Sequence, residues 1–178
     1  TTENAKFTYN PSNWTNTDVV AKASTDVTGF TIQTSLDGKN WNSTASQTLT
    51  ANGNVYARLW DGTNAGGMLT GNVTKIDKTP ATVSISATAT GTSTGTLSAV
   101  VDDKESGLSQ IKWEWGNTTS YENTVTDKYV KMNSSSAGAI ESVTKTKALT
   151  GLSAGTTYYV RITAYDVAGN PTQKTATF

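Results

Sequence analysis

The chain has 178 residues, a length that fits one large domain or two small ones, and two are expected. Charged residues make up only 16%, with 14 basic and 14 acidic side chains in balance, so the chain lacks the basic surface that binds nucleic acid or anionic membranes. It has no cysteine and no histidine, which excludes disulfides, thiol nucleophiles and Cys-ligated metals and removes the commonest general base. No apolar run approaches the roughly 20 residues that cross a bilayer, so no membrane insertion by this segment is expected.

Strand signals run through the first half of the chain. Alternation of Thr or Ser with Val, Ile, Ala or Leu predicts strands with one buried side and one solvent-facing side. The expected strands lie near residue 7 and at 19–23, 30–36, 47–50, 55–60 and 69–76. Turn signals such as Asp37-Gly38, Asn52-Gly53 and Asp61-Gly62 separate them.

The second half continues the pattern. Its expected strands lie at 83–89, 97–101, 111–115, 129–132, 143–149, 158–165 and 173–178. Trp113 and Trp115 share a strand face with Ile111, so both rings are expected in the core. No stretch shows a 3.6-residue apolar stripe, and the pattern therefore predicts an all-β sandwich rather than βαβ units.

An internal similarity places the domain boundary. Residues 55–61 align with residues 160–166: apolar residues alternate, an aromatic residue precedes an Asp, and a Gly/Asn turn follows. Each is expected to be the penultimate strand of its own unit. The segment Asp77-Lys78-Thr79-Pro80 follows the last expected strand of the first unit, and its proline restricts the backbone. The predicted domains are residues 1–78 and 79–178.

The second domain contains Leu149, Leu152, the turn Ala154-Gly155-Thr156 and Tyr158 ahead of an alternating strand. This order resembles the E–F corner and F strand of fibronectin type III domains, with Ala154 in place of the usual proline and without the usual strand-B tryptophan. The resemblance implies an immunoglobulin-like sandwich in which the Tyr158 hydroxyl closes the corner on upstream backbone.

The first domain carries four short motifs, at residues 10–19, 35–41, 52–58 and 76–80. In this order they resemble the bacterial immunoglobulin-like repeats of large surface proteins. Together, the two resemblances imply an all-β fold of two tandem immunoglobulin-like antiparallel β-sandwiches.

Repeats of this kind are typically spacers, stalks and adhesive modules. The resemblance therefore implies a non-catalytic structural or adhesive segment of a bacterial surface protein, extracellular at the cell surface or in the cell wall. The start at Thr1-Thr2-Glu3-Asn4 has no leader-like pattern, and the chain is interpreted as a piece of a longer protein. The expected partners are the neighbouring domains of that protein and a host or cell-wall glycan or protein. The segment itself is expected to be a monomer.

The alternative function is a carbohydrate-binding accessory region of a secreted polysaccharide-degrading enzyme. Exposed tryptophan rings stack on sugar faces, and Trp14 and Trp41 are the candidates; the competing interpretation is that both rings close the ends of domain 1. No catalytic residue is predicted, because the carboxylates fall mainly in turns, where capping of backbone N–H groups is the simpler role.

One metal site is a candidate. In an immunoglobulin-like sandwich the entering chain, the B–C loop and the F–G loop share one pole. Oxygen ligands gathered there suit Ca²⁺, which takes six to eight of them. The competing interpretation is that these side chains are solvated or cap turns, and both interpretations stay open. The candidate ligands are Asp77 from the linker, Asp102, Asp103 and Glu105 from the B–C loop, and Asp166 and Asn170 from the F–G loop.

Overall fold

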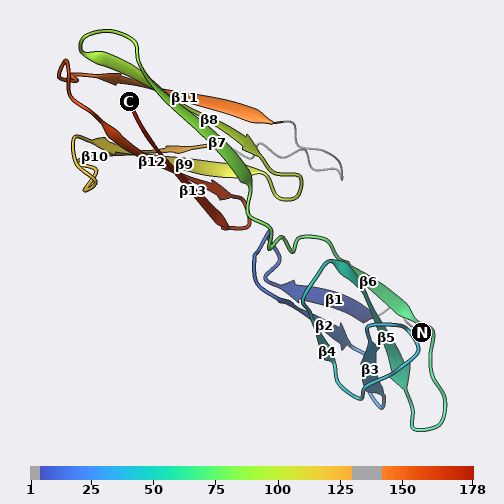
Figure 1. Cartoon of the computed structure of the whole chain (residues 1–178). Helices are drawn as coiled ribbons and strands as arrows, with labels where there is room; N and C mark the ends of the chain where they lie inside the picture. The colour runs from blue at the N-terminus through green and yellow to red at the C-terminus, as the bar shows by residue number, and fades with distance from the viewer. Residues whose placement is uncertain (1–4, 130–141) are drawn as a thin grey trace. The chain divides into compact units, whose positions relative to one another are not determined.

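The computed structural model describes residues 5–129 and 142–178 (Figure 1). Backbone contacts divide the chain into two compact units, Thr1–Lys78 and Thr79–Phe178. All regular elements in the described residues are β-strands, and every pair of neighbouring strands in a sheet is antiparallel.

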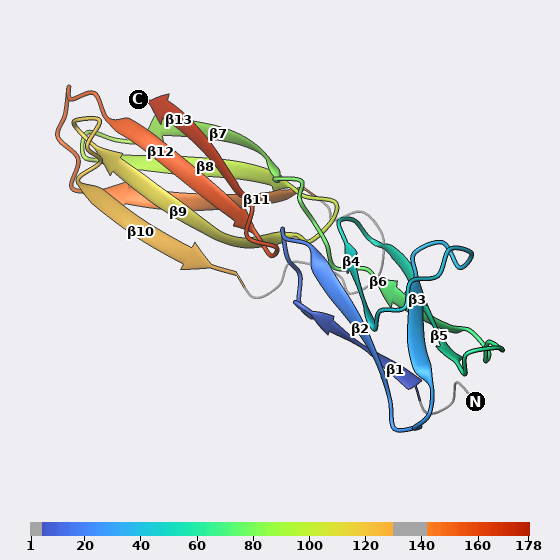
Figure 2. The same ribbon diagram turned by 90° about the horizontal axis from the view of Figure 1, so that it is seen from below.

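The first unit is a sandwich of two three-stranded sheets, ordered β1-β2-β4 and β3-β5-β6. Figure 2 shows β1 beside β2 and β3 beside β5. The strands are β1 (Ala5–Asn10), β2 (Val19–Thr25), β3 (Thr31–Ser35), β4 (Ser46–Leu49), β5 (Gly53–Trp60) and β6 (Leu69–Val73).

Strict alternation builds the core of this unit. In β5 the side chains of Val55, Ala57 and Leu59 are buried, whereas the residues between them face outward. The same alternation in β2 buries Val19 and Ala21 against the opposite sheet. The two inner faces thus remove apolar surface from water, which is the main stabilising term of a sandwich.

The end of the first unit departs from the expected strand. The strand predicted at 69–76 ends at Val73, and Ile76 instead forms a parallel bridge with Thr15. The amide of Thr15 donates to the carbonyl of Lys75 (3.0 Å), and the amide of Asp77 donates to the carbonyl of Thr15 (2.9 Å). Residues 75–77 therefore pair with the β1–β2 connection and not with β5, and these backbone hydrogen bonds hold the buried Ile76 in the core.

The second unit has a three-stranded sheet, ordered β11-β8-β7, and a four-stranded sheet, ordered β10-β9-β12-β13. They form separate layers in Figure 1. This arrangement corresponds to sheets A-B-E and C′-C-F-G of an immunoglobulin-like sandwich. The strands are β7 (Thr82–Ala89), β8 (Thr94–Asp102), β9 (Leu108–Gly116), β10 (Asn123–Lys128), β11 (Val143–Thr150), β12 (Tyr159–Asp166) and β13 (Pro171–Thr177).

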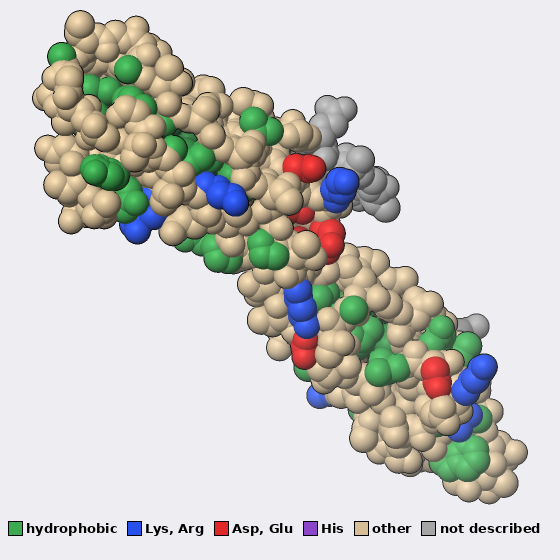
Figure 3. Space-filling view, viewed as in Figure 1, with side chains coloured by type: hydrophobic (Ala, Val, Ile, Leu, Met, Phe, Trp, Pro, Cys, Tyr) green, Lys and Arg blue, Asp and Glu red, His purple; other side chains and the backbone are tan. Residues whose placement is uncertain are grey.

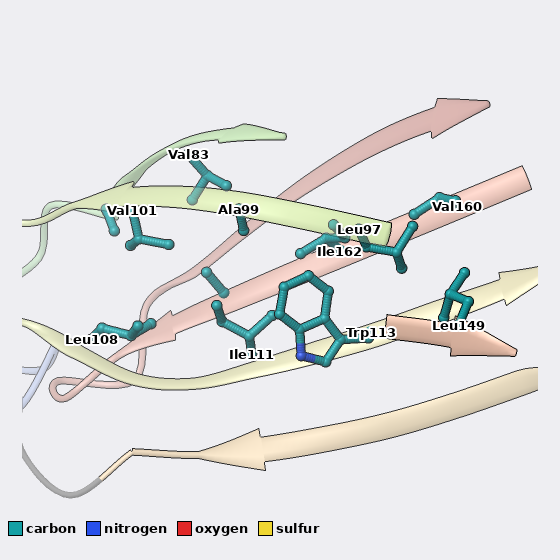
Figure 4. Packing of buried hydrophobic residues seen from close by; sticks show 12 residues of the cluster. Val83, Leu97, Ala99, Val101, Leu108, Ile111, Trp113, Leu149, Val160 and Ile162 are labelled. Carbon is teal, nitrogen blue, oxygen red and sulfur yellow. The ribbon is translucent and has the colours of Figure 1, made fainter. Parts of the chain in front are cut away.

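A tryptophan forms the centre of the second core (Figure 4). Trp113 on β9 is 0% exposed, as the sequence predicts, and its indole N–H donates to Oδ2 of Asp127 (2.9 Å). Leu97 from one sheet and Ile162 from the other are also fully buried in this cluster. Trp115 is only half-buried and packs against the cluster, so the expectation of a core position holds for it in part.

The two tandem antiparallel sandwiches confirm the predicted fold class. In the second unit, one strand lies at a different place from the one predicted. Its fourth strand is β10, at Asn123–Lys128, whereas the sequence predicted a strand at 129–132. Positions 130–132 lie outside the described residues. Because β10 is an edge strand, only Val125 and Asp127 are half-buried, and the other side chains are exposed. An exposed edge strand carries little of the apolar alternation on which the sequence prediction depended.

Candidate functional site

Two loops meet at one end of the second unit. Residues 103–107 follow β8, and residues 167–170 follow β12. The amide of Val167 donates to the carbonyl of Gly107 (2.7 Å), and the amide of Ala168 donates to Oγ of the fully buried Ser106 (3.2 Å). These two loops correspond to the B–C and F–G loops, and their hydrogen bonds bring their carboxylates to one place.

Asp166 closes the second of these loops. Its side chain is 1% exposed; Oδ1 accepts from the backbone amide of Asn170 (2.8 Å) and Oδ2 accepts from Nδ2 of Asn170 (2.7 Å). Gly169 has a φ of +97°, a conformation that a glycine adopts without steric cost. Both N–H groups of Asn170 thus close the turn on the carboxylate, and its carbonyl accepts from the Asp166 amide (3.1 Å).

Asp103 brings a second carboxylate from the first loop. Its Oδ1 accepts from the backbone amide of Glu105 (2.8 Å), and the residue is buried. One carboxylate oxygen of Asp103 lies within 4.8 Å of one carboxylate oxygen of Asp166. Both residues of this aspartate group are buried, and Asp77 is a buried residue of the first unit.

The remaining predicted ligands lie outside this group. Asp102 is the last residue of β8 and is half-buried; its carbonyl accepts a hydrogen bond from the Thr82 hydroxyl (3.2 Å). Glu105 is an exposed residue.

The chemistry of the aspartate group suits a hard cation. Carboxylates this close repel one another when all are ionised, and burial increases that repulsion because solvent screens it less. A divalent cation with oxygen ligands would relieve it. Hydrogen bonds from Asn170 and Glu105 already stabilise two of the carboxylates, which is the capping role of the competing interpretation.

A second feature of interest lies on the outer face of sheet β3-β5-β6 in the first unit. The Arg58 guanidinium carbon lies 4.2 Å from the ring centroid of Trp41 and 5.6 Å from that of Trp60. Its Nε–H donates to Oε1 of Gln33, the residue opposite it on β3 (2.8 Å). The other predicted sugar-binding residue, Trp14, is half-buried in the β1–β2 connection, which belongs to the opposite sheet.

The corner around Tyr158 is also defined. The amide of Ser153 donates to the Tyr158 hydroxyl oxygen (3.0 Å), so the hydroxyl contacts backbone five residues upstream. The Tyr158 ring stacks on Phe178, with centroids 5.6 Å apart. Backbone hydrogen bonds in both directions join the same two residues. Tyr158 therefore links the corner before β12 to Phe178, the residue that follows β13.

Sequence reasoning missed an ion-pair network around the buried Glu114 on the outer face of sheet β10-β9-β12-β13. Glu114 accepts two hydrogen bonds from Arg161 (2.8 and 2.7 Å) and pairs with Lys112 (2.8 Å). The hydrogen bonds from Arg161, then those from Lys112, lower the pKa of Glu114 from its usual 4.5 to about 2. The Arg161 guanidinium also lies over the ring of Tyr121, at 4.4 Å. Alternation indicated only that Glu114 faces away from the core.

No helix among the described residues is long and apolar enough to span a membrane. No protein-family model matches the chain, and no curated protein matches it.

Solved structures that match the chain include segments of tenascin, titin and CNTN1. A two-domain fibronectin type III segment of chicken tenascin has 15% identity, a TM-score of 0.40, and coverage of 97% of this chain and 98% of that one. Domains A168–A170 of titin have 13% identity, a TM-score of 0.47, and coverage of 97% and 65%. The FN1–FN3 domains of chicken CNTN1 have 12% identity and a TM-score of 0.39; the match covers 93% of this chain and 63% of that one.

Proposed function

We propose that this chain is a non-catalytic structural and adhesive segment of an extracellular bacterial surface protein. The observation that carries the proposal is the direct succession of two complete sandwiches, with the division between Lys78 and Thr79. Fibronectin type III and immunoglobulin-like domains are commonly structural modules of this kind. The absence of His and Cys from the sequence supports a non-catalytic role.

The partners in this proposal are neighbouring domains of a longer surface protein and a glycan or protein of the cell wall or host. The segment acts as a monomer, because the apolar side chains are largely used in the two cores. An antibody raised against the chain tests the location: it should label intact cells that produce the full-length protein. Labelling only after permeabilisation would contradict the proposal, and a dimer in light scattering would contradict the monomer.

We also propose that the aspartate group of Asp103 and Asp166 binds calcium as a structural ion. The support is the burial of both residues and the separation of at most 4.8 Å between one carboxylate oxygen of each. A cation that binds only the folded state raises its stability by mass action. Calcium addition to chelator-treated protein should therefore raise the midpoint of thermal unfolding.

Titration calorimetry with CaCl₂ tests this site directly. The Asp166→Asn and Asp103→Asn variants should lose the binding heat. Asp61→Asn removes a carboxylate that caps the exposed turn at Thr63 and Asn64 in the first unit, so it is the matched control and should bind normally. The absence of both heat and thermal shift in the unaltered chain would refute the calcium site, and the surface-protein proposal would still stand on the antibody experiment.

A further inference from the structure

The outer face of sheet β3-β5-β6 differs from an ordinary solvated sheet face. Its outward positions on β5 are Asn54, Tyr56, Arg58 and Trp60, which alternate with the buried core residues of that strand. The exposed positions of β11 in the second unit, by contrast, carry only Thr and Ala. Across the described chain, charged side chains are sparse on the surface seen in Figure 3, where most of the area is neither charged nor hydrophobic.

Trp41 is added to this face by the loop after β3. Asn42 exchanges two backbone hydrogen bonds with Thr34, each 2.9 Å, so the chain at Trp41 runs beside β3. The Trp41 ring then lies under the Arg58 guanidinium, which also approaches Trp60. We define the Arg58 surface as Trp41, Arg58, Trp60, Tyr56 and Gln33.

Arg58 is held in place but is not neutralised. Its Nε–H bonds to Gln33, and two rings contact its guanidinium, so the side chain is ordered before any ligand arrives. Among the described residues no carboxylate pairs with Arg58. The terminal nitrogens of a guanidinium form a planar fork that matches a carboxylate with two parallel hydrogen bonds. An ordered, unneutralised fork is therefore suited to an anionic group of that shape.

We propose that the Arg58 surface binds a carboxylated polysaccharide, in which a uronate carboxylate pairs with Arg58 and the sugar rings lie against the indoles. Charge complementarity identifies the anionic group, because Arg58 is the only charged residue of the surface. Indole rings supply apolar area for the C–H faces of sugars. The inference goes beyond the structural role proposed above and requires only that the first unit is folded.

Polar side chains along the same face favour a glycan over a protein partner. Nδ2 of Asn72 donates to Oδ1 of Asn54 (3.0 Å), and Nδ2 of Asn54 donates to the Tyr56 hydroxyl (3.4 Å). These exposed amides continue the surface with donors and acceptors for sugar hydroxyls. A protein interface is depleted of such amides at its centre and needs a larger apolar core. The large exposed apolar residues of the first unit are few and comprise Val20, Phe30, Leu36 and Met68.

The experiment measures binding of the whole chain to oligogalacturonate by titration calorimetry at physiological ionic strength. The same oligomer with its carboxylates methyl-esterified is the matched ligand, because it keeps the rings and loses the charge. Arg58→Gln removes the fork, and Arg58→Lys keeps a positive charge without the planar fork. Lys22→Gln is the matched protein control, because it removes one exposed positive charge from the other sheet of the same unit.

Binding should be at least about tenfold weaker for the methyl ester and for Arg58→Gln, intermediate for Arg58→Lys, and unchanged for Lys22→Gln. Circular dichroism checks that each variant is folded, and the esterified ligand tests the proposal on the unaltered chain should Arg58→Gln fail to fold. Alginate and hyaluronate extend the test to other uronates. Failure to bind any of the three, or equal binding of the ester, would overturn the proposal. Equal binding of dextran sulfate would show that binding depends only on nonspecific charge attraction, and that result would overturn the proposal too.

Discussion

The hydrogen bonds of Asn52 give a sharp prediction about the first unit. Its Oδ1 accepts from the amide of Ile76 (2.7 Å), and its Nδ2 donates to the carbonyl of the same residue (2.8 Å). Ile76 is 4% exposed and belongs to the core cluster. Asn52→Ala therefore leaves both backbone groups of a buried residue without this partner.

The magnitude follows from the two lost bonds. Each net hydrogen bond contributes about 0.5 to 1.5 kcal/mol, so the free energy of unfolding should fall by roughly 1 to 3 kcal/mol. For a domain of this size about 1 kcal/mol shifts the melting temperature by about 4 to 8 °C. Asn52→Asp keeps the acceptor but loses the donor and turns an anion toward the carbonyl of Ile76, so it should not rescue the loss.

Hydrogen exchange with mass spectrometry is the assay, because it reports on segments. The amide of Ile76 should lose protection in Asn52→Ala, and the β5 amides should report the lower global stability of the unit. Asn54→Ala, two residues along the chain from Asn52, is the matched control: it removes exposed side-chain bonds to Asn72 and Tyr56 and should cost less than about 0.5 kcal/mol. Unchanged exchange at Ile76, or an equal effect of the control, would refute the assignment of this anchor to Asn52.

Three further predictions concern the second unit. Tyr158→Phe removes the hydrogen bond from the Ser153 amide but keeps the ring stack, so the free energy of unfolding in urea should fall by about 1 kcal/mol. An unchanged free energy would show that this hydrogen bond does not stabilise the unit. Glu114 has a folded-state pKa of about 2 against its usual 4.5, so its stabilisation is complete above about pH 4.5 and is lost as pH falls toward 2. The stability difference between the natural chain and Glu114→Gln should shrink over that range, and a difference independent of pH would contradict the pairing with Arg161. Gly116→Ala should destabilise the unit by more than about 1 kcal/mol in the same urea titration, because the new Cβ would lie 2.8 Å from the backbone nitrogen of Glu122; a neutral substitution would show that this turn relaxes freely.

Strand positions and fold class were predictable from the sequence because they depend on local alternation. Val55, Ala57 and Leu59 are buried at the alternate positions of β5, as their spacing requires. The corner around Tyr158 was also accessible, because its turn and its tyrosine lie within a few residues of each other. Where alternation is weak, as in the edge strand β10, the prediction failed.

Side-chain partners depended on the tertiary structure. Glu114 and Arg161 lie opposite each other only because β9 and β12 pair in one particular register. Arg58 meets Trp41 only because the loop after β3 returns along that strand. Registers and loop paths are set by the packing of whole sheets, and a one-residue shift would place every one of these side chains on the other face.

For the candidate metal ligands, one feature was predictable from the sequence and another depended on the folded structure, even within one loop. The gathering of carboxylates at the loops that follow β8 and β12 was predictable from the sequence, because strand order sends those loops to the same pole. The sequence left Asp102 and Asp103 equivalent. The folded structure distinguishes them, because neighbouring residues at a strand end point in opposite directions: Asp103 is buried near Asp166, whereas Asp102 is half-buried outside the group.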